Sequence, residues 1–219
     1  MSKIKTSSAS TIGDRRDVRK KPGTQLSLPN DPLKIGLPSW VIQDGNYGDF
    51  KAGSRVQFAL DFYCENLIPL EEYSIQRRSI KHVEDDQYRV VAQIVHTHAE
   101  WTVLDFGFLA YQDRFLSADL KVGDWVRGEI SLSVDHFAYF ERLSRQTNAP
   151  ALIYTWQIDK IELLTAPWIQ DASGLKRRDT SKWGWKEIPK TDAWKHNDGN
   201  AEYIFTCAKL SDEARAEFG

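Results

Sequence analysis

The chain has 219 residues, of which 41% are hydrophobic and 12% aromatic, enough to bury one sizeable core. Its formal net charge is -2, but the first 34 residues hold eight Lys or Arg against three Asp or Glu, so the rest is acidic, which argues against a general phosphate-binding platform. Two cysteines are too few for a disulfide framework, and no apolar run approaches the length of a membrane span, so we expect a cytoplasmic protein that does not bind membranes.

Residues 1–36 are rich in Ser, Thr, Lys, Arg, Pro and Gly and lack a hydrophobic period, which predicts a disordered basic tail. The cluster from Arg15 to Lys21 either binds an anionic partner or stays solvated. Order is predicted from Leu37, with a short strand from Trp40 to Ile42 and a turn-rich loop at 44–48. We therefore expect a β domain over residues 37–166.

Two segments seventy positions apart, 49–56 and 119–126, share Asp, Lys, Gly and Val at matching positions. Each runs into a stretch in which apolar and polar residues alternate, and this two-residue period predicts a strand with one buried face. The predicted buried rows are Val56, Phe58, Leu60, Phe62 and Cys64 in the first strand and Val126, Gly128, Ile130, Leu132 and Val134 in the second.

Residues 66–87 are ambiguous, since Pro69 is a suitable first residue for a short helix whereas Asp85-Asp86 is typical of a turn. Further strands are expected over 88–94, 101–111 and 152–164. Asp135 is placed to cap a short helix before the last of these strands. In that strand the apolar parity shifts across Asp159-Lys160, which predicts a bulge.

The predicted fold is mainly β: a small antiparallel barrel or a sandwich, with one or two short helices and a C-terminal extension. From Tyr88 to Leu164 the order of strands, Gly-Asp turn and short helix resembles the OB-fold. The resemblance implies that the strand ending at Leu164 closes the sheet. A small sandwich fits the same pattern. Residues 167–219 are rich in Trp and too few for a core of their own, so we expect them to pack on the same domain.

His96 and His98 are the candidate metal ligands, because side chains two residues apart on a strand point the same way. They support one alternative function, a metal-dependent hydrolase. The remaining histidines have no ligand-like spacing, and the rings are equally suited to capping the core near a strand end.

A second alternative is binding of single-stranded nucleic acid, because bases stack on exposed aromatic rings while basic side chains contact phosphates. The opposing interpretation is that the tryptophans anchor the extension to the domain. The candidate binding residues are Arg177, Arg178, Lys182, Trp183, Trp185 and Lys186.

The preferred prediction is a non-enzymatic module that binds a protein partner, as an inhibitor, an immunity-type protein or an assembly protein. An acidic β body with exposed aromatic residues and no complete catalytic set suits this class. No cofactor is expected, because no dinucleotide or phosphate-loop motif is present. Open sheet edges would also allow a homodimer.

Overall fold

A computed structural model describes residues 31–71, 77–98, 101–114, 116, 119–170, 174–210 and 214. Most of the predicted N-terminal tail lies outside these residues, and residues 33–36, which were assigned to the tail, belong to a strand. None of the helices in the described ranges combines the length and the apolar character needed to cross a bilayer.

The described elements are short strands joined by turns and by a few helical segments. The first seven strands are β1 Leu33–Pro38, β2 Arg55–Phe58, β3 Leu60–Tyr63, β4 Leu67–Pro69, β5 Ser79–Glu84, β6 Gln87–His98 and β7 Trp101–Asp105. The next seven are β8 Leu109–Gln112, β9 Trp125–Val134, β10 Tyr154–Leu164, β11 Trp168–Gln170, β12 Lys176–Arg178, β13 Trp185–Ile188 and β14 Glu202–Lys209. The helical segments are α1 Ser39–Gln43, α2 Ala138–Glu141, η1 Leu143–Arg145, η2 Thr180–Lys182 and η3 His196–Gly199.

Five strands form a closed barrel, which confirms the barrel in place of the sandwich. Around the barrel the order is β9, β3, β8, β7 and β6, and β6 pairs with β9 again. All neighbours are antiparallel except β3 and β8, which are parallel. The interior is filled by the apolar rows that the two-residue period predicts, including Leu60, Phe62, Ile130 and Leu132.

The pairings of the barrel are those of an OB-fold with its last strand moved ahead of the first in the sequence. In an OB-fold the first strand pairs with the second and the fourth, and the third pairs with the fifth in parallel. The same pairs occur here when the strands are taken in the order β6, β7, β8, β9 and β3. The expectation that the strand ending at Leu164 closes the barrel is therefore wrong, because β3 fills that place and β10 lies outside the barrel.

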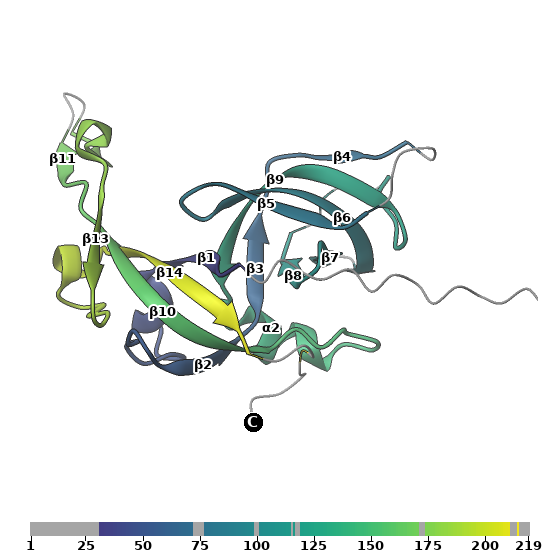
Figure 1. Ribbon diagram of the computed structural model, residues 1–219, viewed down its shortest axis with the longest axis horizontal. Coiled ribbons are helices and arrows are strands. Elements are labelled where there is room, and N and C mark those ends of the chain that lie inside the picture. Colours follow the sequence, from purple (N-terminus) through teal and green to yellow (C-terminus); the bar gives the residue numbers. More distant parts are fainter. Residues whose placement is uncertain are drawn as a thin grey trace, which may run out of the picture.

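Four further strands extend the sheet away from the barrel in the order β1, β14, β10 and β13 (Figure 1). The extension joins the barrel where β1 runs parallel to β9, at the pair Gly36 and Ser133. C-terminal strand β14 lies between β1 and β10, with Phe205 opposite both Ile35 and Ile161. The first repeated strand crosses from the extension to the barrel at Ala59, because β2 pairs with β10 while β3 pairs with β9.

A second apolar cluster covers the outer face of β7 and β8. Trp101, Val103 and Tyr111 point outward from these strands and are fully buried beneath residues 138–153, the cover segment. The indole N–H of Trp101 donates to Gln146 at 2.8 Å, and the hydroxyl of Tyr139 donates to the carbonyl of Pro150 at 2.7 Å. Strands β7 and β8 are thus buried on both faces.

Several local expectations are corrected or confirmed by the pairings. Residues Trp40 to Ile42 lie in helix α1 and not in a strand, because the helix buries Val41 and Ile42 while Trp40 stays exposed. Pro69 is the last residue of edge strand β4, opposite Val126, and does not begin a helix. The bulge in β10 is confirmed by a register shift between Ile158 and Lys160.

The close approach of β4 to β9 depends on Gly128, and this generates a first prediction. A Cβ at Gly128 would lie 2.8 Å from both the carbonyl oxygen of Asn66 and the Cδ2 of Leu67. We expect Gly128→Ala to lower the free energy of unfolding by about 1–3 kcal/mol, because backbone must move to relieve the overlap. The matched control is Gly48→Ala, where a Cβ meets nothing within 4 Å. Urea denaturation that gave equal changes for both variants would contradict this packing.

Candidate functional site

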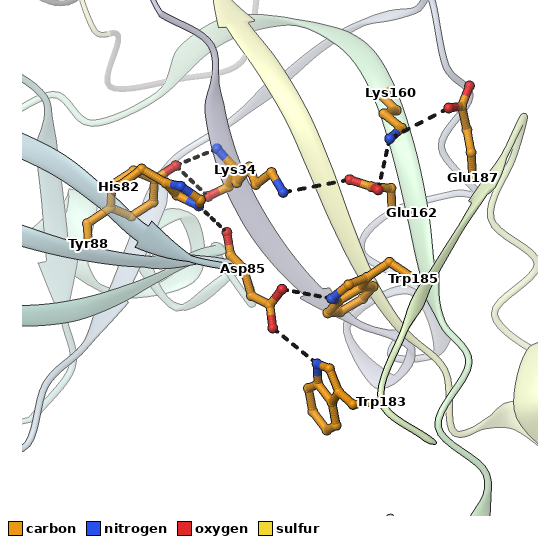
Figure 2. A network of polar contacts seen from close by, with 9 residues as sticks. All are labelled: Lys34, His82, Asp85, Tyr88, Lys160, Glu162, Trp183, Trp185 and Glu187. Carbon is orange, nitrogen blue, oxygen red and sulfur yellow. Dashed lines mark hydrogen bonds and ion pairs between the residues drawn. The ribbon is translucent and has the colours of Figure 1, made fainter. Parts of the chain in front are cut away.

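Two of the predicted binding residues, Trp183 and Trp185, lie against the barrel and contact one carboxylate. Asp85 is in the turn between β5 and β6, and it accepts the indole N–H of Trp185 at 2.7 Å and that of Trp183 at 3.3 Å. Figure 2 shows both indole nitrogens directed at the two oxygens of this carboxylate. The two rings are nearly perpendicular, with their centroids 6.3 Å apart. The contact joins the C-terminal extension to the barrel.

Further polar contacts join β1 to the barrel and to β10 (Figure 2). The hydroxyl of Tyr88, on barrel strand β6, accepts the backbone N–H of Lys34 at 2.5 Å and donates to the Lys34 carbonyl at 3.2 Å. On the extension, Glu162 pairs with Lys160 at 2.8 Å and lies 4.0 Å from the ammonium group of Lys34. These contacts link β1 to barrel strand β6 and, across β14, to β10.

Arg178 is enclosed by protein groups. Its guanidinium lies 4.5 Å from the ring centroid of Trp168, donates to the carbonyl of Ala166 at 2.9 Å and donates to that of Asn200 at 2.5 Å. The side chain is only 9% exposed, and a carboxylate oxygen of Glu202 lies 3.8 Å away. These contacts indicate that Arg178 holds the β11–β12 hairpin in place.

The other predicted binding residues are spread along the extension. Lys182 pairs with Asp179 at 3.4 Å, three residues earlier. Arg177 lies on β12 and Lys186 on β13, and both are exposed. Strand β12 pairs with β11 in a separate two-stranded sheet, whereas β13 pairs with β10 in the main sheet. Of these three basic residues only Lys186 shares a strand with one of the two tryptophans, and adjacent residues of a strand point to opposite faces.

The two tryptophans line a cleft of about 320 Å³ at the junction of barrel and extension, which we call the acidic cleft. Its other walls come from β1, β9, β14 and the β5–β6 turn. Three carboxylates line it, and no Lys, Arg or His is among the described residues that do so. The residues used below are Asp85, Asp86, Glu202, Trp183 and Trp185.

Asp86 is a buried carboxyl of the cleft. Its pKa is raised to about 6, mainly by burial and also by the negative charges of Asp85 and Glu202, while a hydrogen bond from its own backbone N–H lowers it. The carboxylate lies over Gly36, where a Cβ would approach its Oδ2 to 2.6 Å. The glycine thus leaves the space that Asp86 occupies beside β1.

His96 and His98 remain apart from the cleft, at the end of β6. The His96 ring lies 4.6 Å from that of Trp101, and its buried Nε2 has no hydrogen-bond partner among the described residues. Burial lowers the His96 pKa, and His98 lowers it further. Within the described ranges, no group of three or more His, Cys, Asp or Glu is placed to hold a metal ion. The metal alternative therefore gains no third ligand from these residues.

A second charged cluster, which the sequence did not indicate as a site, surrounds His136. Its Nδ1 lies 3.4 Å from Asp61 on β3, and its Nε2 lies 3.5 Å from Asp113 beyond β8. The hydrogen bond to Asp61 is the main cause of a raised His136 pKa. Nearby, Asp135 accepts the hydroxyl of Tyr111, and burial raises the pKa of Asp135 to about 6. The sequence indicated only a capping role for Asp135, and the N-cap of α2 is instead Phe137, which makes no side-chain cap hydrogen bond.

The His136 cluster ties the cover segment to the barrel. Arg142, which follows α2, lies 3.6 Å from Asp113, and the backbone N–H of Tyr139 donates to Asp135 at 3.4 Å. Each acidic group of the cluster thus has a cationic or hydrogen-bonding partner from the chain itself. In the acidic cleft, by contrast, Asp85 has only neutral indole donors, and the guanidinium of Arg178 is 3.8 Å from Glu202. This weaker positive counter-charge makes the cleft the stronger candidate for a ligand site.

The Asp86 carboxyl should make stability depend on pH. Its pKa is higher in the folded than in the unfolded protein, so the free energy of unfolding falls as pH rises from about 4 to about 6. We expect Asp86→Asn to be more stable than wild type at pH 8, on the order of 1–2 kcal/mol after allowance for partial exposure, and equal to it near pH 3.5. Urea denaturation at several pH values measures this, with the exposed Asp44→Asn as the control. A wild-type-like pH slope in the Asp86 variant would contradict the assignment.

His136 should act on stability in another pH range. Its pKa is raised by folding, so its contribution is complete below the unfolded pKa of about 6.5 and is lost as pH rises through the folded value. We expect His136→Gln to cost on the order of 1.5 kcal/mol at pH 6, as for a hydrogen bond between charged groups, and less at pH 9. Denaturation curves of the two proteins at both pH values test this. An equal loss at pH 6 and pH 9 would show that packing and not charge is responsible.

Comparisons with known proteins identified no relatives. No family model matches the sequence, and no curated protein matches it. No solved structure matches the fold. The function of the chain therefore has to be inferred from the geometry of its own residues.

Proposed function

We propose that the protein is a non-enzymatic binding module that recognises a protein partner at the acidic cleft. The observation that carries this proposal is the setting of Trp183 and Trp185, which line a cleft together with three carboxylates. Trp183 is 48% exposed, so part of a large aromatic surface is open to a ligand. Exposed Trp beside an apolar pocket wall is typical of the residues that contribute most to protein–protein binding.

Single-stranded nucleic acid fits this setting poorly. A phosphate backbone entering the cleft would meet the negative charges of Asp85, Asp86 and Glu202. The face that OB-folds use for oligonucleotides corresponds to β7 and β8, and here the cover segment occupies it. Arg178, whose guanidinium lies 3.8 Å from the cleft residue Glu202, is already bonded to two backbone carbonyls. These observations favour a protein partner over a nucleic acid.

The proposal covers three kinds of role, namely inhibitor, immunity-type protein and assembly protein. All three need a stable surface and no chemistry, and the closed barrel with its covered face provides such a scaffold. A second copy of the chain is a further candidate partner, because β5 and β13 are edge strands of the main sheet. The proposed location is the cytoplasm, where the two buried free thiols, Cys64 and Cys207, would stay reduced.

The test is capture of a partner from a lysate of the producing cells on immobilised variants. We expect wild type and Trp194→Ala to retain the same protein. Trp183→Ala should retain at most a tenth as much, which corresponds to a loss of binding free energy on the order of 1.4 kcal/mol. Trp194 is the control because it is 70% exposed and is not among the cleft residues. Circular dichroism checks that each variant is folded. Retention that is equal for all three proteins would refute the role of the cleft.

A second measurement separates the protein from the nucleic-acid alternative. We expect a single-stranded oligonucleotide to leave the tryptophan fluorescence unchanged at low salt, because the cleft repels phosphates. Quenching that disappears in Trp183→Ala would instead support nucleic-acid binding.

A further inference from the structure

The charge of the acidic cleft is not balanced by its own walls. Asp85 is bonded by two indole N–H groups, which are neutral donors and leave its negative charge in place. In the described part of the chain, no Lys or Arg forms an ion pair with Asp85 or Asp86, and Glu202 has only the guanidinium of Arg178 at 3.8 Å. That guanidinium is already shared with two carbonyls. The cleft therefore carries excess negative charge.

Asp86 adds a cost that a positive ligand would remove. Its carboxylate is partly buried over Gly36, with the like charges of Asp85 and Glu202 nearby. Like charges in a poorly solvated space repel one another, and each is stabilised when a cation enters between them. A ligand with a positive group would thus gain energy from the cleft that a neutral ligand would not.

The aromatic walls add a preference for one kind of cation. The perpendicular rings of Trp183 and Trp185 have no cation over them among the described residues. A guanidinium stacks on an indole face and donates two parallel N–H groups to a carboxylate, whereas an ammonium acts as a compact point charge. The chain itself uses this stacking where Arg178 lies 4.5 Å from the ring centroid of Trp168.

We propose that the acidic cleft binds an arginine side chain of a basic segment in the partner protein. The inference rests on the proposed function, because it names the partner chemistry of the same site. The volume of about 320 Å³ is at the lower end of the range for ligand pockets, which suits one inserted side chain better than a large ligand. The guanidinium lies between the carboxylates of Asp85 and Asp86 and against the ring of Trp183.

The test uses the full chain and three synthetic peptides with blocked ends. The peptides differ only at three positions, which are all arginine in the first, all lysine in the second and all glutamate in the third. Calorimetric titration at pH 7.5 and low salt is expected to give a dissociation constant at least tenfold lower for the arginine than for the lysine peptide, and no binding of the glutamate peptide. Asp86→Asn and Trp183→Phe should each raise the dissociation constant of the arginine peptide about tenfold. Asp44→Asn and Trp194→Phe, at exposed positions outside the cleft, should leave it unchanged.

The outcomes separate the two proposals. Equal binding of all three peptides, or an affinity for the arginine peptide that Asp86→Asn does not change, would overturn the arginine assignment. Capture of a partner that depends on Trp183 would in that case still support the proposed function. No peptide binding together with capture that is insensitive to Trp183→Ala would overturn both.

One more variant identifies a competing occupant, the chain's own basic cluster. In the full chain, Arg15, Arg16 and Arg19 are replaced by Ser. Unchanged peptide affinity supports a partner segment as the occupant. Binding that appears only in this variant would overturn the partner assignment, because the cluster itself would then fill the cleft.

Discussion

The carboxylate of Asp85 connects the two parts of the molecule, because it accepts the indole N–H groups of both Trp183 and Trp185. Asp85 lies in a hairpin turn of the barrel, whereas the tryptophans lie in the C-terminal extension. The bond from Trp185 is short, at 2.7 Å, as expected for a charged acceptor, and it fixes the distance between the β5–β6 turn and β13. Neutral donors leave the charge unbalanced, and the contact that shapes the cleft therefore also makes it anionic.

The cover segment decides which surface is left for a ligand. An OB-type barrel normally offers the outer face of its second and third strands, here β7 and β8. Trp101, Val103 and Tyr111 give that face an apolar surface, and residues 138–153 bury it completely. The His136 cluster and the hydrogen bond from Trp101 to Gln146 keep the segment in place. A concave surface lined by the exposed ring of Trp183 remains at the junction with the extension.

The parts of the fold that were predictable are those that depend on neighbouring residues. Alternation in the two repeated strands indicated their buried rows correctly, and the parity shift at Asp159 indicated the bulge. The strand predicted for Trp40 to Ile42 was wrong, because this segment forms helix α1, which packs Val41 and Ile42 into the core. In the candidate site, Trp183 and Trp185 were identified as aromatic residues of interest, but their acceptor is about a hundred positions earlier and gave no local signal.

The sequence by itself determined that the protein is built of strands with one apolar face, because the two-residue period is a local property of the chain. It also determined an acidic body in which tryptophan is concentrated near the C-terminal end. Only the tertiary structure decided that β3 closes the barrel, that β14 enters the sheet between β1 and β10, and that carboxylates surround Trp183. Strand partners and the charge around a side chain depend on contacts between distant residues, which no local pattern specifies.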